Sequence, residues 1–251
     1  MKTMIYVTTN SISNKAEIQV PIILPDSTEK IKSEKNLKFL ADPFSSFDPQ
    51  KIDLKIGISG FLLGENKMKS LKVIGIIISD KNKNDFEILV LEKFKRTIKL
   101  LFSINKGLPI INCKWIEQCL KQKKIVDYNV FQFNDNEAET QFGFSLKKSL
   151  DISFNKIPKG VFFGFSFWMP QGDEECREDI KIVVTSGGGV WYEQNPKTKG
   201  ENYYEIIAAK NVKENGNNEF KNRYCSKEDI YQSSLEQNTV CIGKLTVNRN
   251  K

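Results

Sequence analysis

The chain has 251 residues, of which 39% are hydrophobic and 27% charged, and its formal net charge is +7. This composition is typical of a globular protein and excludes a chain too polar to build a core. The apolar runs are far shorter than the roughly 20 residues of a membrane span, and the N-terminus lacks the apolar core of a signal peptide. We therefore expect a protein that stays inside the cell.

The chain contains no histidine. Catalytic Ser-His-Asp and Cys-His arrangements, two-His zinc proteases and an imidazole base are thereby excluded. The five cysteines form no CxxC pair, so neither a disulfide framework nor a closed zinc site is indicated. The acidic run 173–179 is more typical of a solvated helix start than of a catalytic carboxylate pair. We expect a protein that is not an enzyme and that has no catalytic residues, no metal and no cofactor.

Residues 1–51 are polar, show no sustained helical or strand period, and are predicted to be an extension. From residue 52 onward, apolar runs alternate with helical patterns. We predict strands over 55–63, 76–79, 86–91 and 108–112, and helices over 66–75, 96–107 and 113–124. Strands alternating with helices at this spacing indicate a parallel sheet with both faces covered.

The remainder of the chain is predicted to be a linker and a second, divergent copy of this unit. Residues 134–155 are expected to form one short amphipathic linker helix. From residue 156 to 247 a weaker version of the same order follows: apolar runs at 160–168, 180–184, 190–192 and 203–209, a glycine-rich turn at 185–189, and long polar loops at 196–202 and 211–222. A phosphate-binding P-loop at the glycines is not favoured, because GxxxxGK[ST] is absent. A duplicated α/β unit, with repeats at 52–133 and 156–247, is the economical interpretation.

One segment of the first unit is strongly basic. Residues 93–124 contain nine Lys or Arg residues and a single acid, Glu117, so the segment has a net charge of +8. Charge of this kind indicates an anionic partner or a solvated surface. Trp115 and the apolar residues near it follow a helical period and are predicted to be core.

The run RTIKLLFSINKGLPIINCKWIEQCL, with the later FGFSL, resembles the first repeat and linker of a tandem BRCT module of the kind found in DNA-damage adaptors. The resemblance is good over about residues 52–150 and thin beyond 156. It implies an α/β fold with two tandem repeats, each a parallel four-stranded sheet flanked by helices, joined by a linker helix. The last helix of the second repeat lacks the aromatic residue usual in the family.

The resemblance also implies a phosphoserine site in the first repeat. Its phosphate-binding positions match Ser59, Gly60 and Lys99. The chemistry of these residues supports the assignment, because glycine lets the backbone approach an anion, a hydroxyl donates to it, and Lys99 lies near a helix N-terminus. The alternative for Ser59 is an ordinary turn residue, and for Lys99 a solvated charge. Thr97 is predicted to cap the helix.

Four further residues are candidates for contacting the peptide. The resemblance implies that Arg96 contacts the third residue after the phosphoserine, a role that suits its planar fork of donors. The alternative is an ion pair with the linker or the second repeat. Leu101, Arg177 and Ile182 are predicted to line the pocket for that third residue.

Two functions of different class remain open. The first is a non-catalytic, monomeric, nuclear adaptor that reads a phosphorylated protein tail in DNA-damage signalling or chromatin; the tail of a variant core histone is the ligand that the resemblance implies. The second is a nucleic-acid-binding module that uses residues 93–124, indicated by a pI of about 9.0. The first is favoured, because the aromatic residues near the basic segment follow core periods and form no exposed stacking row.

Overall fold

The computed structural model describes residues 53–80, 83–156, 159–172, 174–207 and 224–242. All described residues belong to one compact unit. The predicted extension 1–51, the predicted polar loop 211–222 and the end of the second predicted repeat lie outside the described residues. Within the described part, no helix is long and apolar enough to cross a membrane.

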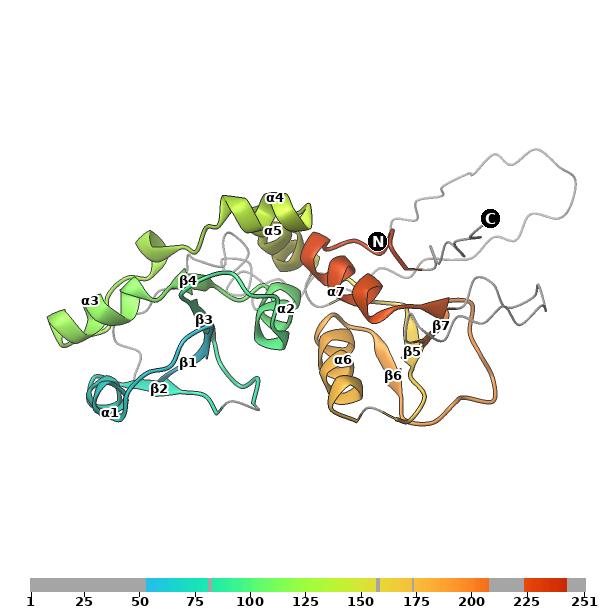
Figure 1. Ribbon diagram of the computed structural model, residues 1–251, viewed down its shortest axis with the longest axis horizontal. Helices are drawn as coiled ribbons and strands as arrows, with labels where there is room; N and C mark the ends of the chain where they lie inside the picture. Colours follow the sequence, from blue (N-terminus) through green and yellow to red (C-terminus); the bar gives the residue numbers. More distant parts are fainter. Residues whose placement is uncertain (1–52, 81–82, 157–158, 173, 208–223, 243–251) are drawn as a thin grey trace, which may run out of the picture. The chain divides into compact units, whose positions relative to one another are not determined.

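The first half of the described chain forms a four-stranded parallel sheet with the order β2-β1-β3-β4 (Figure 1). Its elements are β1 (Leu54–Ser59), α1 (Glu65–Val73), β2 (Ile76–Ile78), β3 (Ile88–Leu91), α2 (Ile98–Asn105), β4 (Ile110–Asn112) and α3 (Lys114–Gln122). Each predicted strand and helix is present, with the longest predicted strand shortened to six residues. The parallel sheet that the sequence predicts is confirmed.

The second half repeats the same topology, with the strand order β6-β5-β7-β8 and all pairs parallel. Its elements are β5 (Ser166–Trp168), α6 (Glu174–Ser186), β6 (Val190–Tyr192), β7 (Tyr203–Ile206), β8 (Tyr224–Cys225) and α7 (Lys227–Glu236). The apolar run 180–184 is the C-terminal part of α6, and the run 160–168 is a strand only in its last three residues. The prediction of a duplicated α/β fold is confirmed.

The glycine-rich segment is the tight turn between α6 and β6, as predicted. Gly188 has a φ of +81°, and a Cβ there would lie 2.1 Å from the carbonyl oxygen of Lys159. Only glycine fits at such a close approach of two backbone segments. The glycines therefore serve packing against the segment that precedes β5.

The first sheet is buried on both faces. Leu89 and Leu91 of β3 pack in the same core cluster as α2, whereas Ile88 and Val90 pack with residues of α1 and α3. Successive side chains of a strand point to opposite faces, so β3 separates the two clusters. Helix α2 therefore covers one face of the sheet, and α1 and α3 cover the other.

The linker contains two helices, α4 (Asn136–Phe142) and α5 (Leu146–Lys156), so the prediction of one helix is wrong. Gly143 ends α4 in the left-handed conformation, with a φ of +65°. The carboxylate of Glu139 then accepts a hydrogen bond from the backbone N–H of Leu146, at 3.1 Å. A glycine at this position is a common helix stop signal.

The apolar side chains of the linker pack against the first repeat. Leu146 is buried, and Phe142 and Phe144 are partly buried. The two rings lie 5.3 Å and 5.5 Å, respectively, from the ring of Phe94, which precedes α2. Leu146 thus belongs to the core of the protein, and the two phenylalanines pack against it while keeping part of their surface exposed.

The two repeats meet through α2, which packs against α6 and α7 of the second repeat. At the end of α2, the Asn105 side chain is 2% exposed. Its Nδ2 lies 2.9 Å from the carbonyl oxygen of Val183, 3.1 Å from Oγ of Ser186 and 3.3 Å from Oγ of Ser234. Its Oδ1 accepts a hydrogen bond from Nε2 of Gln237 at 2.9 Å. One amide therefore joins α2 to both helices of the second repeat.

The linker helix α5 also forms hydrogen bonds to Asn105 and Gln237. The Ser153 hydroxyl of α5 donates a hydrogen bond to the Asn105 carbonyl oxygen at 2.9 Å, and the Lys156 ammonium donates one to the Gln237 carbonyl oxygen at 2.7 Å. First repeat, linker and second repeat are thus tied by one buried polar network. Such networks are costly to break, because the remaining polar groups lose their partners without gaining water.

We predict that Asn105→Ala lowers the free energy of unfolding by about 2–4 kcal/mol, since several buried polar groups lose partners. Asn155→Ala on α5 is the matched control: its side chain is exposed and bonds only within its own helix, so a change within about 0.5 kcal/mol is expected. Urea unfolding followed by circular dichroism measures both. Equal stability of the two variants would show that the network does not hold the repeats together.

Candidate phosphate and peptide site

Ser59 and Gly60 lie where β1 leaves the sheet. Ser59 is the last residue of β1 and is 8% exposed. Its Oγ lies 3.0 Å from Oγ1 of Thr97, the residue that precedes α2. Gly60 is exposed and has a φ of +86°, a conformation that L side chains rarely adopt. The carboxyl end of β1 is therefore joined to the start of α2 by two hydroxyl groups.

Thr97 is the N-cap of α2, as predicted. Its Oγ1 accepts a hydrogen bond from the backbone N–H of Leu100 at 3.4 Å. Lys99 is the second residue of the helix, and the first turn contains no acidic residue. The unpaired N–H groups and the dipole at a helix N-terminus favour an anion.

The Lys99 ammonium is half-buried. Its Nζ donates a hydrogen bond to the carbonyl oxygen of Asp80 at 3.3 Å and lies 5.7 Å from the centroid of the Phe86 ring. Burial lowers the pKa of Lys99 below its ordinary value of 10.5, and the nearby charges of Asp85 and Asp80 oppose this shift. A partly desolvated ammonium interacts more strongly with an anion than a fully solvated one does.

Asp85, one of the two acidic residues whose charge acts on Lys99, is already paired with other residues. It accepts hydrogen bonds from the Lys55 ammonium at 2.7 Å and from the Ser79 hydroxyl at 2.6 Å. Lys55 first, and then Ser79, hold the pKa of Asp85 down at about 2. Asp85 therefore stays ionised over the physiological range, bound to partners other than Lys99.

The three predicted phosphate-binding residues thus come from two elements that meet at Thr97. The sequence suggested Thr97 only as a helix cap, and its contact with Ser59 was missed because the two residues are 38 positions apart. The chemistry of these groups suits an anion, because hydroxyl groups and a backbone N–H are neutral donors and an ammonium is a charged one. Their binding of a phosphate stays a prediction.

Arg96 faces the linker and the second repeat. Its guanidinium forms an ion pair with Glu228 of α7 and lies 5.4 Å and 5.5 Å from the ring centroids of Phe142 and Tyr231. This is the alternative that the sequence left open, an ion pair with the second repeat. Contact between Arg96 and a peptide stays a prediction, and such a contact would compete with Glu228 or share the guanidinium with it.

Leu101 does not offer a surface to a peptide in this structure. Its side chain is 0% exposed and belongs to the core cluster around α2. The expected role of Leu101 as a pocket wall is therefore corrected to a role in the core. The sequence could not distinguish the two, because both place an apolar residue on the inner side of α2.

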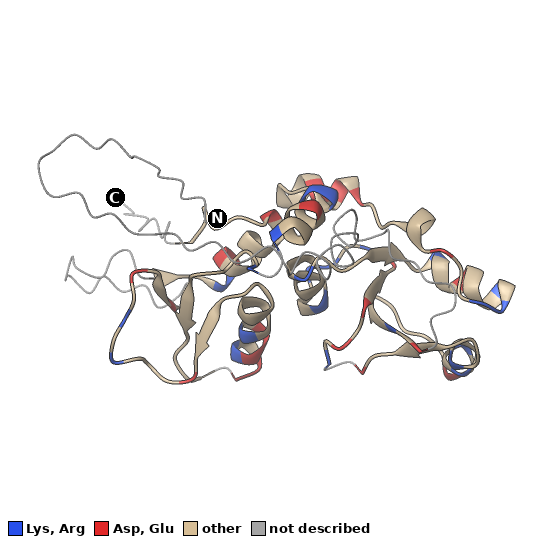
Figure 2. Ribbon diagram, turned by 180° about the vertical axis from the view of Figure 1, so that it is seen from behind, with Lys and Arg blue, Asp and Glu red and all other residues tan. Residues whose placement is uncertain are grey.

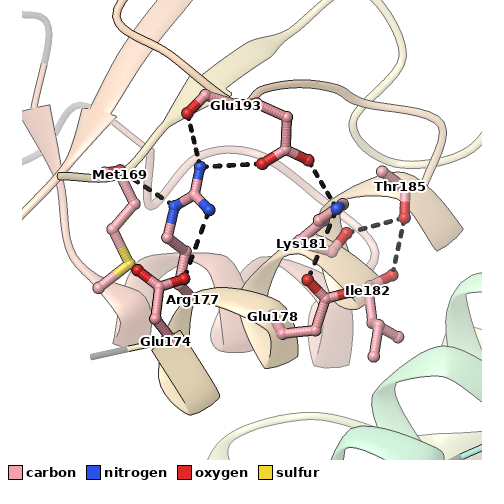
Figure 3. Close-up of polar contacts among 8 residues, drawn as sticks. All are labelled: Met169, Glu174, Arg177, Glu178, Lys181, Ile182, Thr185 and Glu193. Carbon is pink, nitrogen blue, oxygen red and sulfur yellow. Dashed lines mark hydrogen bonds and ion pairs between the residues drawn. The ribbon is translucent and has the colours of Figure 1, made fainter. Parts of the chain in front are cut away.

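The guanidinium of Arg177 also has hydrogen-bond partners within the protein (Figure 3). It is 9% exposed, and its guanidinium donates to the carbonyl oxygen of Met169 at 3.4 Å, to that of Glu193 at 2.8 Å and to the Glu193 carboxylate at 3.0 Å. The ring of Trp191 lies 5.5 Å from the guanidinium carbon. Arg177 thus fixes the segments after β5 and β6 to α6, and a contact between Arg177 and a peptide stays a prediction.

Ile182 remains as the predicted peptide residue of the second repeat. It lies on α6 and is partly buried, and its carbonyl oxygen accepts a hydrogen bond from the Thr185 hydroxyl at 3.3 Å (Figure 3). Helix α6 packs against α2. Ile182 therefore retains some exposed surface on a helix that adjoins the first repeat.

Comparison with known proteins agrees with this architecture. Residues 41–133 match the family model described as the Regulator of Ty1 transposition protein 107 BRCT domain. The chain is 24% identical over 139 residues to the DNA damage response protein Mdb1 of Schizosaccharomyces pombe, covering 55% of this chain and 22% of that protein. It is 25% identical over 173 residues to PAX-interacting protein 1 of Bos taurus, covering 69% of this chain and 16% of that protein.

Among solved structures, the BRCT5-BRCT6 domains of S. pombe Brc1 share the fold. The TM-score is 0.60 at 20% identity, over 74% of this chain and 93% of that one. The chain spans about a fifth or less of the two relatives named above. Residues 41–133 thus match a BRCT family model, and the described chain has the fold of tandem BRCT domains, with two sheets of equivalent strand order and linker helices between them.

Proposed function

We propose that the chain is a phosphoserine-peptide-binding adaptor without catalytic activity. The observation that carries the proposal is the meeting of Ser59 with Thr97 at the N-terminus of α2, with Lys99 in the first helical turn. A phosphate placed there would receive hydrogen bonds from a hydroxyl and a backbone N–H, a charge-assisted bond from an ammonium, and the field of the helix. An unphosphorylated serine offers no charge to the last two of these groups.

The proposed partner is a phosphorylated protein tail, such as that of a variant core histone, read during DNA-damage signalling in the nucleus. The resemblance to BRCT adaptors suggests this ligand, and the name of the relative Mdb1, a DNA damage response protein, supports the setting. The absence of histidine from the sequence supports a binding role over an enzymatic one. A monomer suffices, because both repeats that flank the site belong to one chain.

Recognition beyond the phosphate is proposed to rest on Arg96 and Ile182. Arg96 lies immediately before the N-cap of α2 and keeps 22% of its side chain exposed. A peptide carbonyl or terminal carboxylate could take up guanidinium donors that the Glu228 ion pair leaves open, since arginine has five N–H donors. Leu101 and Arg177 have no part in this proposal, because both are occupied inside the protein.

We predict that Lys99→Met weakens phosphopeptide binding by about 2–4 kcal/mol, or very roughly 30-fold to 1000-fold, because a partly desolvated phosphate loses a charged partner. Ser59→Ala should cost less, about 1–2 kcal/mol, since a hydroxyl is a neutral donor. Titrations at fixed salt with matched phosphorylated and unphosphorylated peptides measure these changes, and circular dichroism checks folding.

Lys121→Met is the matched control. Lys121 belongs to the same basic segment but is exposed on α3, which covers the opposite face of the sheet from α2. Its replacement removes the same charge and should leave phosphopeptide affinity within about 2-fold. If Lys99→Met binds the phosphopeptide as well as Lys121→Met does, the site is not the one proposed.

The pH dependence of binding provides a further prediction. Affinity should rise as pH increases through about 6, where phosphoserine becomes a dianion, and fall at alkaline pH as Lys99 loses its proton. Because burial lowers the pKa of Lys99 below 10.5, this fall should begin at a lower pH than for an exposed lysine. Arginine stays charged at alkaline pH, so the Lys99→Arg variant should keep its affinity for the phosphopeptide in the pH range where the wild type loses affinity. Parallel alkaline losses in the wild type and Lys99→Arg would contradict the role of Lys99.

A further inference from the structure

The basic segment 93–124 is divided between two faces of the first sheet. Arg96 and Lys99 lie at the start of α2, whose apolar side packs in one core cluster. Four lysines of the same segment lie on or directly after α3, whose Trp115 and Ile116 pack in the other cluster. The net charge of +8 therefore does not form one surface, and most of the α3 charge is unexplained by phosphopeptide binding.

Helix α1 adds to the charge on the α3 side. Leu71 of α1 packs in the same cluster as Trp115, and the two helices contact each other. Figure 2 shows lysines on both helices. Residues 65–73 and 114–124 together contain seven lysines and two acids, a net charge of +5. The lysines are Lys67, Lys69, Lys72, Lys114, Lys121, Lys123 and Lys124, and we call them the α1/α3 lysine face.

All seven lysines are exposed, and none forms an ion pair with another residue in the described part of the chain. Elsewhere in that part, several cations are neutralised internally: Lys55 by Asp85, Lys83 by Asp80, and Lys181 by Glu178 and Glu193. The lysine face is distinguished by its density of positive charge, because two helices in contact carry seven lysines and only two acids, Glu65 and Glu117. Such a face attracts polyanions over several ångströms.

We propose that the α1/α3 lysine face binds the phosphate backbone of duplex nucleic acid, separately from the phosphopeptide site. A helix of nine residues, the length of α1 and of α3, is about 14 Å long. A duplex carries one charge per about 1.7 Å of its axis with both strands counted, so a stretch of this length has about eight phosphates, of which only some face the helix. The number and length of the lysine-bearing elements therefore suit backbone contacts without base recognition.

The side chains available on this face favour a duplex over single strands. Single-stranded nucleic acids are typically held by exposed aromatic residues on which bases stack. The aromatic residue of α3, Trp115, is 0% exposed, and its indole N–H donates a hydrogen bond to the carbonyl oxygen of Val126 at 2.9 Å. Helix α1 contains no aromatic residue. The exposed lysines of this face therefore suit contacts to backbone phosphates better than stacking on bases.

The test measures binding of a 20-base-pair duplex of arbitrary sequence by fluorescence anisotropy between about 20 and 200 mM salt. The test variant carries Lys69→Gln, Lys72→Gln, Lys121→Gln and Lys124→Gln. The matched control carries Lys106→Gln, Lys147→Gln, Lys148→Gln and Lys197→Gln, four exposed lysines outside the face. Both variants lose the same net charge, so a difference between them reports the location of the charge.

We expect the wild type to bind the duplex with a logarithmic salt slope of about −3 to −5, from about 0.9 for each phosphate neutralised. The test variant should bind about 30-fold or more weakly at low salt, with a slope reduced by about 3. The control variant should stay within about 3-fold of the wild type. Equal losses in the two quadruple variants, or no measurable duplex binding by the wild type, would overturn the proposal.

Further binding measurements distinguish a duplex from other polyanions, and the lysine face from the phosphopeptide site. Tighter binding of a single-stranded oligonucleotide, or of vesicles containing phosphatidylserine, would overturn the assignment to duplex. Lys99→Met should bind duplex normally, and the test variant should bind phosphopeptide normally. Loss of both ligands with Lys99→Met would also overturn it, by showing a single shared site. Because the two ligands are assayed separately, a failed phosphopeptide site leaves the duplex result interpretable.

Discussion

The burial of Asn105 at the end of α2 is the constraint on which the arrangement of the two repeats depends. The side-chain amide exchanges hydrogen bonds with α6, with α7 and with the residue that ends α7, and its backbone carbonyl accepts one from the linker. An asparagine without these partners would be costly to bury. Its presence specifies how α2 faces the second repeat, in addition to the apolar packing around it.

The same helix carries the candidate phosphate site at its other end. Thr97 and Lys99 lie in the first turn of α2, and Asn105 is its last residue. A helix of eight residues is short and rigid, so fixing its C-terminal end against the second repeat also orients its N-terminal end against β1. Arg96, with its ion pair to Glu228, provides a second tie near the start of the helix. The geometry of the proposed phosphate site in one repeat thereby depends on the packing of the other.

Much of the fold could be predicted from local patterns. Alternating apolar runs and helical periods correctly indicated the strands and helices of the first repeat, and Thr97 was recognised as a helix cap. The division of the linker at Gly143 was signalled by the glycine itself but was overlooked. In the thin pattern of the second repeat, residues 180–184 were given only as an apolar run, because a short apolar run fits a buried helix as well as a strand; the structure places them in α6.

The site was only partly predictable, because its decisive contacts join residues distant in sequence. Nothing near Arg177 indicated that Glu193 and Met169 would occupy its guanidinium, and nothing near Leu101 distinguished core from pocket. The basic segment 93–124 was the clearest feature of the sequence, but its charge wrongly suggested a single basic surface. Its charge is real, but the sheet divides it between α2 and α3, which face different clusters.

The central claim is that a phosphate binds where β1 meets the start of α2. The most direct measurement is a nitrogen–proton correlation NMR titration of the whole chain with two peptides that differ only in a phosphate on one serine. The account predicts that the phosphopeptide shifts the amide signals of Gly60, Thr97 and Lys99 most strongly, while the unphosphorylated peptide leaves them in place. Unchanged signals at Gly60 and Thr97, with the largest shifts on α1 and α3 instead, would contradict it.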